Sequence, residues 1–427
     1  MKYAFLLVFI GVALIGCSPA RQLARELRKD PVYADRMMGF ALFDPATGKQ
    51  LIQHNADQPF APASNTKLFT FYAGLLTLPD SLPVLLYAVR PDSLIFWGTG
   101  NPLLLHPDLP DTTALSFLRT RPERLFFSPA NYDGPRFGPG WAWDDYNDDY
   151  SPELASLPIY GNVARFEEGQ SSPRRFTDSL QITPDARPVK GVRRAEFSNQ
   201  FTRSGPGKLT RQDVPFRWSA GLAAQLLADT LHRPVEVVKQ AMPTAIRVLR
   251  GSSTDSLYKR MLQVSDNQFA EQVLFMISAE RGLVSPGSAR LHPVAELRRV
   301  ADSVLRYPSV KAKWVDGSGL SRYNLFTPNV MIDLLTKIAA LVPQPRLFAL
   351  LPAAGQSGTL QEMNVAQKPY IFAKSGSMSG VYNLSGYILT QRGKVLYFSA
   401  MNNNFTGSVA TVRRQTATLL KQVHDRF

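Results

Sequence analysis

Apolar and polar positions follow recognisable periods from the first part of the chain onward. Between residues 21 and 36, apolar side chains recur among charged ones at Leu23, Leu27 and Val32. This spacing predicts a first helix that lies with one face on the body of the fold. The segments that follow predict a strand, a turn and a returning strand, at residues 39–43, 44–48 and 49–54.

The segment around Ser64 predicts the start of a helix. Pro62 and several small polar residues precede the apolar stretch 68–78, an order that is typical of a helix N-terminus. Further helical periods cover residues 219–231, residues 256–281 with a polar step at 265–267 and Gly282 as the closing residue, and residues 408–423. Two apolar, aromatic-rich runs predict a strand hairpin that Lys374-Ser375-Gly376 directly precedes, at residues 381–389 and 395–401.

The middle of the chain differs from the rest in amino-acid composition. Between about Leu85 and Pro215, proline, glycine and aromatic residues are frequent and long helical periods are missing. This composition predicts a strand-rich domain inserted at residues 86–214, so that residues 21–85 and 215–427 form the main domain. The strands and helical periods together fit a fold of the α/β class, of the α+β kind.

The N-terminus has the pattern of a signal peptide. Lys2 is followed by the uncharged run 3–15, which is shorter than the roughly 20 residues of a membrane-spanning helix. The run ends in Leu14-Ile15-Gly16-Cys17, which resembles the lipobox of bacterial lipoproteins. The resemblance implies that residues 1–16 are removed and that Cys17 is lipidated, on the periplasmic face of a bacterial membrane. The alternatives are a signal peptide that happens to contain cysteine, or an uncleaved anchor.

Composition and charge exclude several classes of protein. Among 427 residues there is one cysteine, so no internal disulfide can form, and the five histidines show no metal-ligand spacing. We therefore expect no metal and no cofactor. The formal net charge is +14, but the basic residues are scattered and no nucleic-acid module is recognisable. For an exported protein, attraction to an anionic envelope or to a carboxylate-rich polymer is the better interpretation, and no nucleic-acid partner is expected.

Three short motifs carry the candidate chemistry. They are Ser64-x-x-Lys67, Ser265-Asp266-Asn267 and Lys374-Ser375-Gly376, in this order along the chain. A second Ser-x-x-Lys at Ser256 and Lys259 lies inside a predicted helix and is interpreted as a surface coincidence. Together the three motifs resemble the signature of penicillin-recognising serine acyltransferases, the penicillin-binding proteins and serine β-lactamases.

The spacing of the first motif has a physical reason. Residues three apart on a helix share a face, so the amine of Lys67 can reach the hydroxyl of Ser64. A serine hydroxyl needs an adjacent base, and lysine serves as one only when it is neutral. Lowering its pKa to about 7 or 8 takes roughly 3 to 5 kcal/mol, which burial and a second cation can supply. Lys374 is the candidate for that cation, and with Ser375 it could hold a substrate carboxylate.

The resemblance assigns the remaining roles. Ser265 would relay a proton to the leaving amine, and Asn267 would hold the substrate backbone and the base. The backbone N–H groups of Ser64 and Ser377 would form the oxyanion hole. Gly376 belongs to the substrate-binding motif, and Ser375 stands where threonine is usual, which keeps the hydroxyl.

Longer sequence segments indicate a more specific family. The segments around Asp316, Leu351 and Val381, with the segment 141–145, resemble the D-Ala-D-Ala carboxypeptidase/endopeptidase family of class C penicillin-binding proteins. This resemblance implies a transpeptidase-like domain, with an antiparallel sheet flanked by helices, that is split by an insertion. It also implies an acyl-enzyme at Ser64 formed with peptidoglycan stem peptides or with β-lactams. It also implies that Asp145 recognises the amino group of a diamino acid and that Arg322 binds near the substrate carboxylate. For Asp145 the alternative is a turn or cap residue beside two core tryptophans, and for Arg322 it is a structural ion pair.

Two other functions stay open from the sequence. One is a β-lactamase or esterase on the same scaffold, and the other is a peptidoglycan-binding protein that has lost catalysis. The presence of all five residues Ser64, Lys67, Ser265, Asn267 and Lys374 speaks against an inactive binder, which has no physical need for them.

Overall fold

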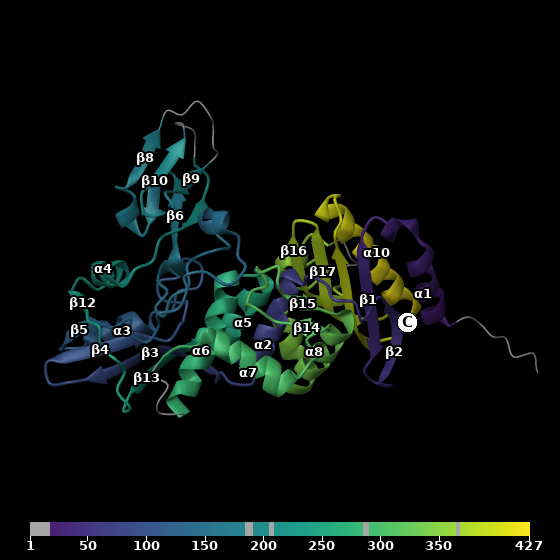
Figure 1. The fold of residues 1–427 in the computed structure, drawn as a ribbon, viewed down its shortest axis with the longest axis horizontal. Coiled ribbons are helices and arrows are strands. Elements are labelled where there is room, and N and C mark those ends of the chain that lie inside the picture. Colours follow the sequence, from purple (N-terminus) through teal and green to yellow (C-terminus); the bar gives the residue numbers. More distant parts are fainter. Residues whose placement is uncertain (1–17, 184–190, 205–208, 285–289, 364–367) are drawn as a thin grey trace, which may run out of the picture.

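The computed structural model describes residues 18–183, 191–204, 209–284, 290–363 and 368–427 (Figure 1). The predicted signal peptide and Cys17 lie outside these residues. No helix in the described part of the chain has the length and apolar character needed to cross a membrane.

A five-stranded antiparallel sheet organises one end of the molecule. Its strands run in the order β16 (Ile371–Met378), β17 (Val381–Leu389), β18 (Val395–Asn403), β1 (Met37–Asp44) and β2 (Lys49–His54). On one face lie α1 (Pro19–Lys29) and α10 (Val409–Arg426), whose apolar residues share a core with the strands. On the other face α8 (Pro328–Leu341) packs against β1 and β18. The expected antiparallel sheet flanked by helices is therefore confirmed, as is the hairpin of β17 and β18.

Local sequence explains where several elements differ from expectation. The first helix ends at Lys29 instead of continuing to residue 36, because Pro31 disfavours helical backbone before it, and the short 3₁₀ helix η1 (Pro31–Tyr33) follows. The Lys374 motif precedes the hairpin as expected, but it lies inside a strand of its own, β16, which pairs with β17. Gly282 does not close a helix, because it keeps right-handed backbone and the helix runs on to Val284.

A helical layer forms the centre of the molecule. The 3₁₀ helix η2 (Ala63–Thr66) leads into α2 (Lys67–Leu75), which is buried between α6 (Asn267–Val284) and α8. Around them lie α5 (Thr254–Gln263), α7 (Pro293–Arg299) followed by a helical segment (Val300–Leu305), α9 (Gln344–Leu350), η7 (Gly358–Leu360) and the short strands β14 (Ala312–Lys313) and β15 (Leu325–Phe326). The predicted polar step at 265–267 separates α5 from α6, which confirms the interruption.

The far end of the molecule is rich in strands, as expected. A five-stranded sheet has the order β12 (Val235–Val237), β5 (Arg124–Phe127), β4 (Ser93–Gly98), β3 (Ser81–Val89) and β13 (Arg247–Ser253). It packs with α3 (Thr113–Thr120) and α4 (Ala220–Leu231). Two smaller sheets contain β11 (Gln212–Pro215), β6 (Val163–Glu167) and β7 (Gln170–Ser172), and β8 (Leu180–Thr183), β10 (Phe201–Ser204) and β9 (Val192–Arg194). The turns η3 (Trp143–Asn147), η4 (Tyr160–Asn162) and η5 (Arg174–Phe176) connect them.

The large sheet of this end extends past both predicted boundaries of the insertion. The boundary at residue 86 falls inside β3, and α4, β12 and β13 follow residue 214. The predicted boundaries mark the places where the amino-acid composition changes. The sheet, however, is completed by β12 and β13, which follow residue 214. The helix α4 is amphipathic, like the helices of the main domain. The composition therefore did not indicate that α4 belongs to the strand-rich end.

Candidate active site

Ser64 and Lys67 meet where η2 passes into α2. They lie one helical turn apart, and Lys67 Nζ donates a hydrogen bond of 3.0 Å to Ser64 Oγ. Ser64 is half-buried, whereas Lys67 is the first residue of α2 and is fully buried. The predicted pairing of amine and hydroxyl is therefore present in the structure.

Three oxygen atoms surround the amine of Lys67. Besides Ser64 Oγ, Nζ donates to Asn267 Oδ1 at 2.6 Å and to the carbonyl oxygen of Ser318 at 2.8 Å. Burial lowers the pKa of Lys67 from its ordinary value to about 8, although the charges of Asp316, Glu271 and Asp266 act in the opposite direction. An amine with this pKa is partly neutral at neutral pH and can accept the proton of Ser64.

The turn between α5 and α6 connects the two lysines. Asn267 bonds to Lys67, while Ser265 Oγ accepts a hydrogen bond of 2.9 Å from Lys374 Nζ. Ser265 has φ +65°, a left-handed backbone that a serine adopts only when its surroundings enforce it. The next residue, Asp266, is held in place because its carboxylate accepts from Phe269 N at the start of α6 and from Arg260 Nε. Burial, and then the charge of Lys67, hold the pKa of Lys374 well below its ordinary value.

The strand β16 lies directly against η2. A Cβ atom on Gly376 would come within 2.4 Å of Pro62 O and 3.0 Å of Ser64 N, so only glycine allows this approach. Ser377 follows on the same strand and lines the same cleft as Ser64. The two backbone N–H groups assigned to the oxyanion hole thus belong to adjacent segments.

A cleft of about 490 Å³ contains most of the predicted site. Its lining includes Ser64, Ser265, Asn267, Ser377, Asp145 and Arg322. Lys67 and Lys374 lie beneath it, fully buried, and reach it through their hydrogen bonds to Ser64 and Ser265. The structure therefore brings residues from distant parts of the sequence to one surface.

Asp145 and Arg322 lie in the cleft away from the nucleophile's network. Asp145 accepts a hydrogen bond of 3.0 Å from Tyr150 OH, and burial raises the pKa of Asp145, with help from Asp148 and Asp144. Trp143 is 77% exposed, so Asp145 does not lie beside two core tryptophans.

Arg322 makes a contact that the sequence did not suggest. It donates to the carbonyl oxygen of Ser379 at 2.8 Å, and no structural ion pair of Arg322 occurs among the described residues.

Ser375 is placed differently from its neighbours. Its hydroxyl meets Thr359 Oγ1 at 2.6 Å, and the residue is largely buried and does not line the cleft. Thr359 was part of a string that carried the family resemblance, but no role followed from the sequence. The alternative Ser-x-x-Lys pair, Ser256 and Lys259, lies on the exposed side of α5, as expected.

Two buried carboxylates beneath Lys67 were missed by the sequence analysis. Glu271 lies one turn after Asn267 on α6 and accepts hydrogen bonds from Gly317 N at 3.0 Å and Ser318 N at 2.7 Å. Asp316 accepts from four donors: Gly319 N, Ser321 N, Asn324 Nδ2 and Trp141 Nε1. Burial, and then the charge of Asp316, raise the pKa of Glu271 to about 7. A lone acid in the apolar stretch 269–279 was the available signal for Glu271.

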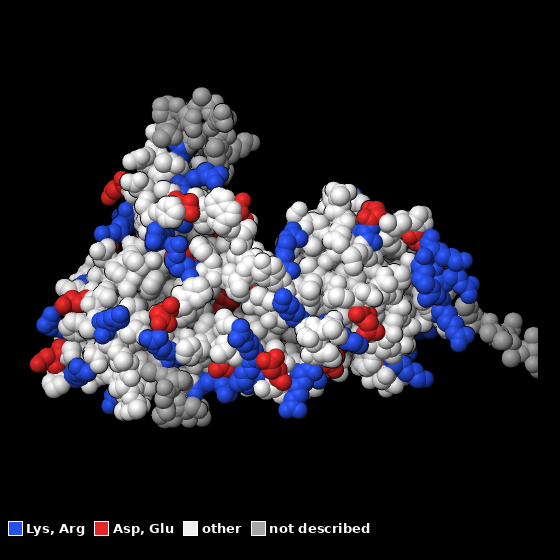
Figure 2. Space-filling view, viewed as in Figure 1, with Lys and Arg blue, Asp and Glu red and all other residues white. Residues whose placement is uncertain are grey.

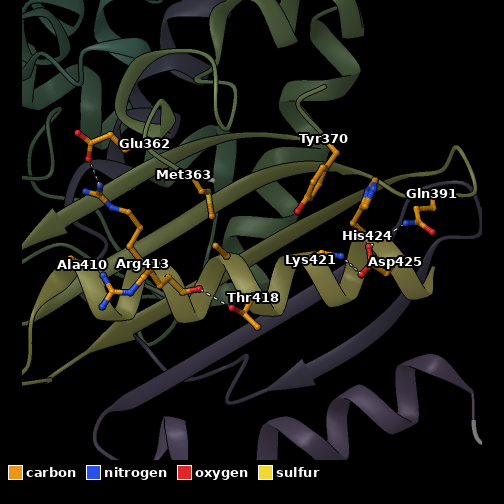
Figure 3. Close-up of a pocket in the computed structure, with 12 residues that line it drawn as sticks. Glu362, Met363, Tyr370, Gln391, Ala410, Arg413, Thr418, Lys421, His424 and Asp425 are labelled. Carbon is orange, nitrogen blue, oxygen red and sulfur yellow. Dashed lines mark hydrogen bonds and ion pairs between the residues drawn. The ribbon is translucent and has the colours of Figure 1, made fainter. Parts of the chain in front are cut away.

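The volume of a hollow does not identify the candidate active site. A larger hollow of about 820 Å³ lies beside α10 (Figure 3) and contains none of the predicted residues. Two ion pairs lie on its walls, between Arg413 and Glu362 and between Lys421 and Asp425. No group of His, Cys, Asp or Glu suited to hold a metal ion occurs within the described ranges.

A family model matches residues 20–181 and 214–423, which is most of the chain. The chain belongs to the D-Ala-D-Ala carboxypeptidase 3 (S13) family. The matched ranges omit residues 182–213, which lie within the predicted insertion. Membership confirms the family that the motifs indicated and the predicted enzyme class, a serine D-Ala-D-Ala carboxypeptidase that acts on peptidoglycan.

Individual S13 relatives and structures agree with this assignment. A D-alanyl-D-alanine carboxypeptidase of Actinomadura sp. (strain R39) is 28% identical, over 93% of this chain and 86% of the relative. The crystal structure of penicillin binding protein 4 from Haemophilus influenzae has a TM-score of 0.74 at 21% identity, over 95% of this chain and 99% of that one. A predatory endopeptidase from Bdellovibrio bacteriovorus has a TM-score of 0.52 at 16% identity, over 91% and 93% of the two chains. Both structures share the fold.

Proposed function

We propose that Ser64 is the nucleophile of this peptidase and that Lys67 is its general base. One observation carries the proposal: the buried amine of Lys67 lies 3.0 Å from Ser64 Oγ and has a pKa lowered to about 8. In the reaction, the proton of Ser64 Oγ moves to neutral Lys67 Nζ as Oγ attacks the carbonyl carbon of the penultimate D-Ala. The N–H groups of Ser64 and Ser377 then stabilise the oxyanion.

The second lysine serves the leaving group. As the C–N bond breaks, Ser265 Oγ gives its proton to the leaving D-Ala nitrogen and is resupplied through its hydrogen bond with Lys374. The proton that Lys67 took from Ser64 replaces, by way of Lys374, the one that Ser265 gave up, so Lys67 is neutral again. Water then attacks the acyl-enzyme carbonyl and gives a proton to Lys67, which returns it to Ser64 Oγ as the ester bond breaks. Lys374 has the charge to attract the terminal carboxylate of the substrate, and the hydroxyl of Ser375, which meets that of Thr359, is proposed as a second donor to it.

Asp145 and Arg322 are proposed as substrate contacts of the S13 cleft. Asp145 has the charge to bind the ammonium of a diamino acid in the stem peptide, and Arg322 has the charge to bind a carboxylate. Because one structural relative is described as an endopeptidase, cross-linked stem peptides are proposed as substrates besides terminal D-Ala. Digestion of purified muropeptides, with the products identified by mass, tests this: release of D-Ala alone from intact dimers would limit the enzyme to carboxypeptidase action.

Acylation tests the nucleophile. A structure of penicillin binding protein 4 from Haemophilus influenzae is described as a complex with a β-lactam, so a fluorescent penicillin is a suitable probe. We expect a covalent band on a denaturing gel for the natural chain and none for Ser64→Ala, with at least a hundredfold slower labelling for Lys67→Ala. Ser256→Ala is the matched control and should label normally. Labelling of Ser64→Ala would contradict the proposal, and rapid turnover of the drug would indicate a β-lactamase.

The chain is proposed to act in the cell envelope, attached through lipid on Cys17. The tripeptide Leu14-Ile15-Gly16 ahead of Cys17 supports this. Metabolic labelling with a radioactive fatty acid should mark the natural chain and leave Cys17→Ser unlabelled. Equal labelling of the two chains would contradict the anchor.

A further inference from the structure

The helix α1 presents a strongly basic surface. Leu23 and Leu27 of this helix are buried against the five-stranded sheet, while Arg21, Arg25 and Arg28 are exposed. Spacings of four and three residues place these arginines on one side, opposite the buried leucines. Lys29 is exposed beside them. We name these four residues, Arg21, Arg25, Arg28 and Lys29, the α1 basic face.

The charges of the α1 basic face are not neutralised within the described part of the chain. None of its side chains forms an ion pair there, and the one acid of the helix, Glu26, binds Arg426 of α10 instead. Figure 2 shows the result as a dense group of Lys and Arg side chains at the end of the molecule where α1 lies. Elsewhere on this view, acidic and basic side chains are interspersed. The positive field is therefore concentrated at one end.

The place of α1 in the molecule suggests what covers this face. Ser18 caps α1, so residues 1–17 precede the basic face directly. Figure 1 shows α1 at one end of the longest axis and the sheet of β3, β4 and β5 at the other. A membrane attachment near Cys17 would bring α1, and not the strand-rich end, next to the lipid headgroups.

We propose that the α1 basic face docks on the anionic phospholipid headgroups of the membrane. Arginine suits this partner because its planar guanidinium forms paired hydrogen bonds with phosphate oxygens. Such a surface adds an attachment to the proposed lipid on Cys17 and does not depend on peptidase activity. Docking through α1 would direct the long axis away from the bilayer, so that the cleft and the strand-rich end face the peptidoglycan.

Vesicle binding tests the proposal with a chain that lacks lipid. Every helix and strand that the structure describes lies within residues 18–427, so a chain of these residues keeps the fold. We expect it to sediment with vesicles of phosphatidylglycerol and phosphatidylethanolamine, and to stay in solution with vesicles of phosphatidylcholine alone. Added salt should release it, because ions screen the attraction over distances of about 8 Å at physiological strength.

Charge variants locate the surface. The triple variant Arg21→Gln/Arg25→Gln/Arg28→Gln should bind anionic vesicles at least about tenfold more weakly, since each basic residue near a membrane contributes to attraction. The matched control removes three exposed arginines of the strand-rich end, Arg90→Gln/Arg119→Gln/Arg247→Gln, with the same change in net charge. We expect it to bind within about twofold of the parent chain. Labelling by fluorescent penicillin should be unchanged in both, which confirms folding and separates this proposal from the proposed catalysis.

Three results would overturn the proposal. The first is equally weakened vesicle binding by the two triple variants, which would indicate attraction by overall charge. The second is equal binding of the parent chain to anionic vesicles and to phosphatidylcholine vesicles. The third is binding to isolated anionic wall polymer without binding to vesicles.

Discussion

The amine of Lys67 has no access to solvent and depends on protein oxygens for its hydrogen bonds. Its ammonium form is therefore disfavoured, and its pKa falls to about 8. Below this pH the neutral fraction falls about tenfold for each pH unit. We expect the rate of acylation by a penicillin to rise tenfold per unit up to about pH 8 and then to level off, as measured by stopped-flow or timed gel labelling.

Glu271 modulates the same amine. Its carboxylate holds the Gly317 and Ser318 amides, and Ser318 O in turn accepts from Lys67. In Glu271→Gln the negative charge is lost, which disfavours the ammonium further, so the rising limb of the pH profile should move to lower pH. The two N–H groups bond to different oxygens of Glu271, and in glutamine an NH2 donor replaces one of these oxygens, so one hydrogen bond is lost. We expect the plateau rate to fall roughly tenfold, the effect of about 1.4 kcal/mol.

A matched variant separates this effect from general damage to the core. Glu153 is also buried and accepts from a backbone N–H, that of Trp218, but its charge is not among those that act on Lys67. Glu153→Gln should leave the position of the pH limb where it is in the natural chain. If Glu271→Gln lowers the rate equally at every pH, Glu271 has a structural role only.

At the scale of elements, the site depends on how closely β16 approaches η2. The two segments carry the N–H groups of Ser377 and Ser64, and Gly376 is the point of contact. In Gly376→Ala the new Cβ would lie 2.4 Å from Pro62 O, so the strand has to move away. Separation of the two donors should lower the acylation rate by about a hundredfold or more, the usual effect of losing one oxyanion donor.

Gly407→Ala is the control for this prediction. Nothing lies within 4 Å of a Cβ at that position, so both the acylation rate and the thermal midpoint should stay near those of the natural chain. A Gly376→Ala chain that acylates at the natural rate would show that the oxyanion donors are not set by this contact.

At the scale of the whole molecule, the strand-rich end and the central helices jointly build the cleft. Tyr150 O accepts from Asn267 Nδ2, and Trp141 Nε1 donates to Asp316. Asp108 reinforces this junction, because it accepts from Arg165 of β6 and from Arg260 of α5. The hydrogen bonds of Arg165 hold the pKa of Asp108 well below its usual range.

Asp108→Asn should weaken this junction in a pH-dependent way. A carboxylate whose folded pKa is depressed stabilises the protein above its unfolded pKa and loses this effect as pH falls. In urea unfolding we expect the variant to be less stable by about 2 kcal/mol at pH 7. The difference should shrink below about pH 4, where the unfolded natural chain takes up a proton on Asp108 while the folded protein does not. Asp229→Asn, in the exposed pair with Arg175, should change stability by less than about 1 kcal/mol at either pH. A deficit that persists unchanged in acid would contradict the role of the charge.

The sequence by itself determined the local elements and the type of chemistry. The strands β1, β2, β17 and β18 and the helices near residues 64, 219 and 408 follow from hydrophobic periods, which are properties of adjacent residues. The order of the three motifs indicated the family, and the pairing of Ser64 with Lys67 follows from helical spacing alone.

Only the tertiary structure decided which distant groups meet. Lys67 bonds to Asn267 and Ser318, which lie 200 and 251 residues further along the chain, and the buried carboxyl groups of Glu271 and Asp316 act on the charge of Lys67. The extent of the strand-rich sheet likewise depends on β13, which returns to pair with β3. A hydrophobic period shows that a face is buried but not what it packs against. Desolvation depends on every segment that surrounds a group, and the hydrogen-bond partners of Lys67 alone come from three segments far apart in the sequence.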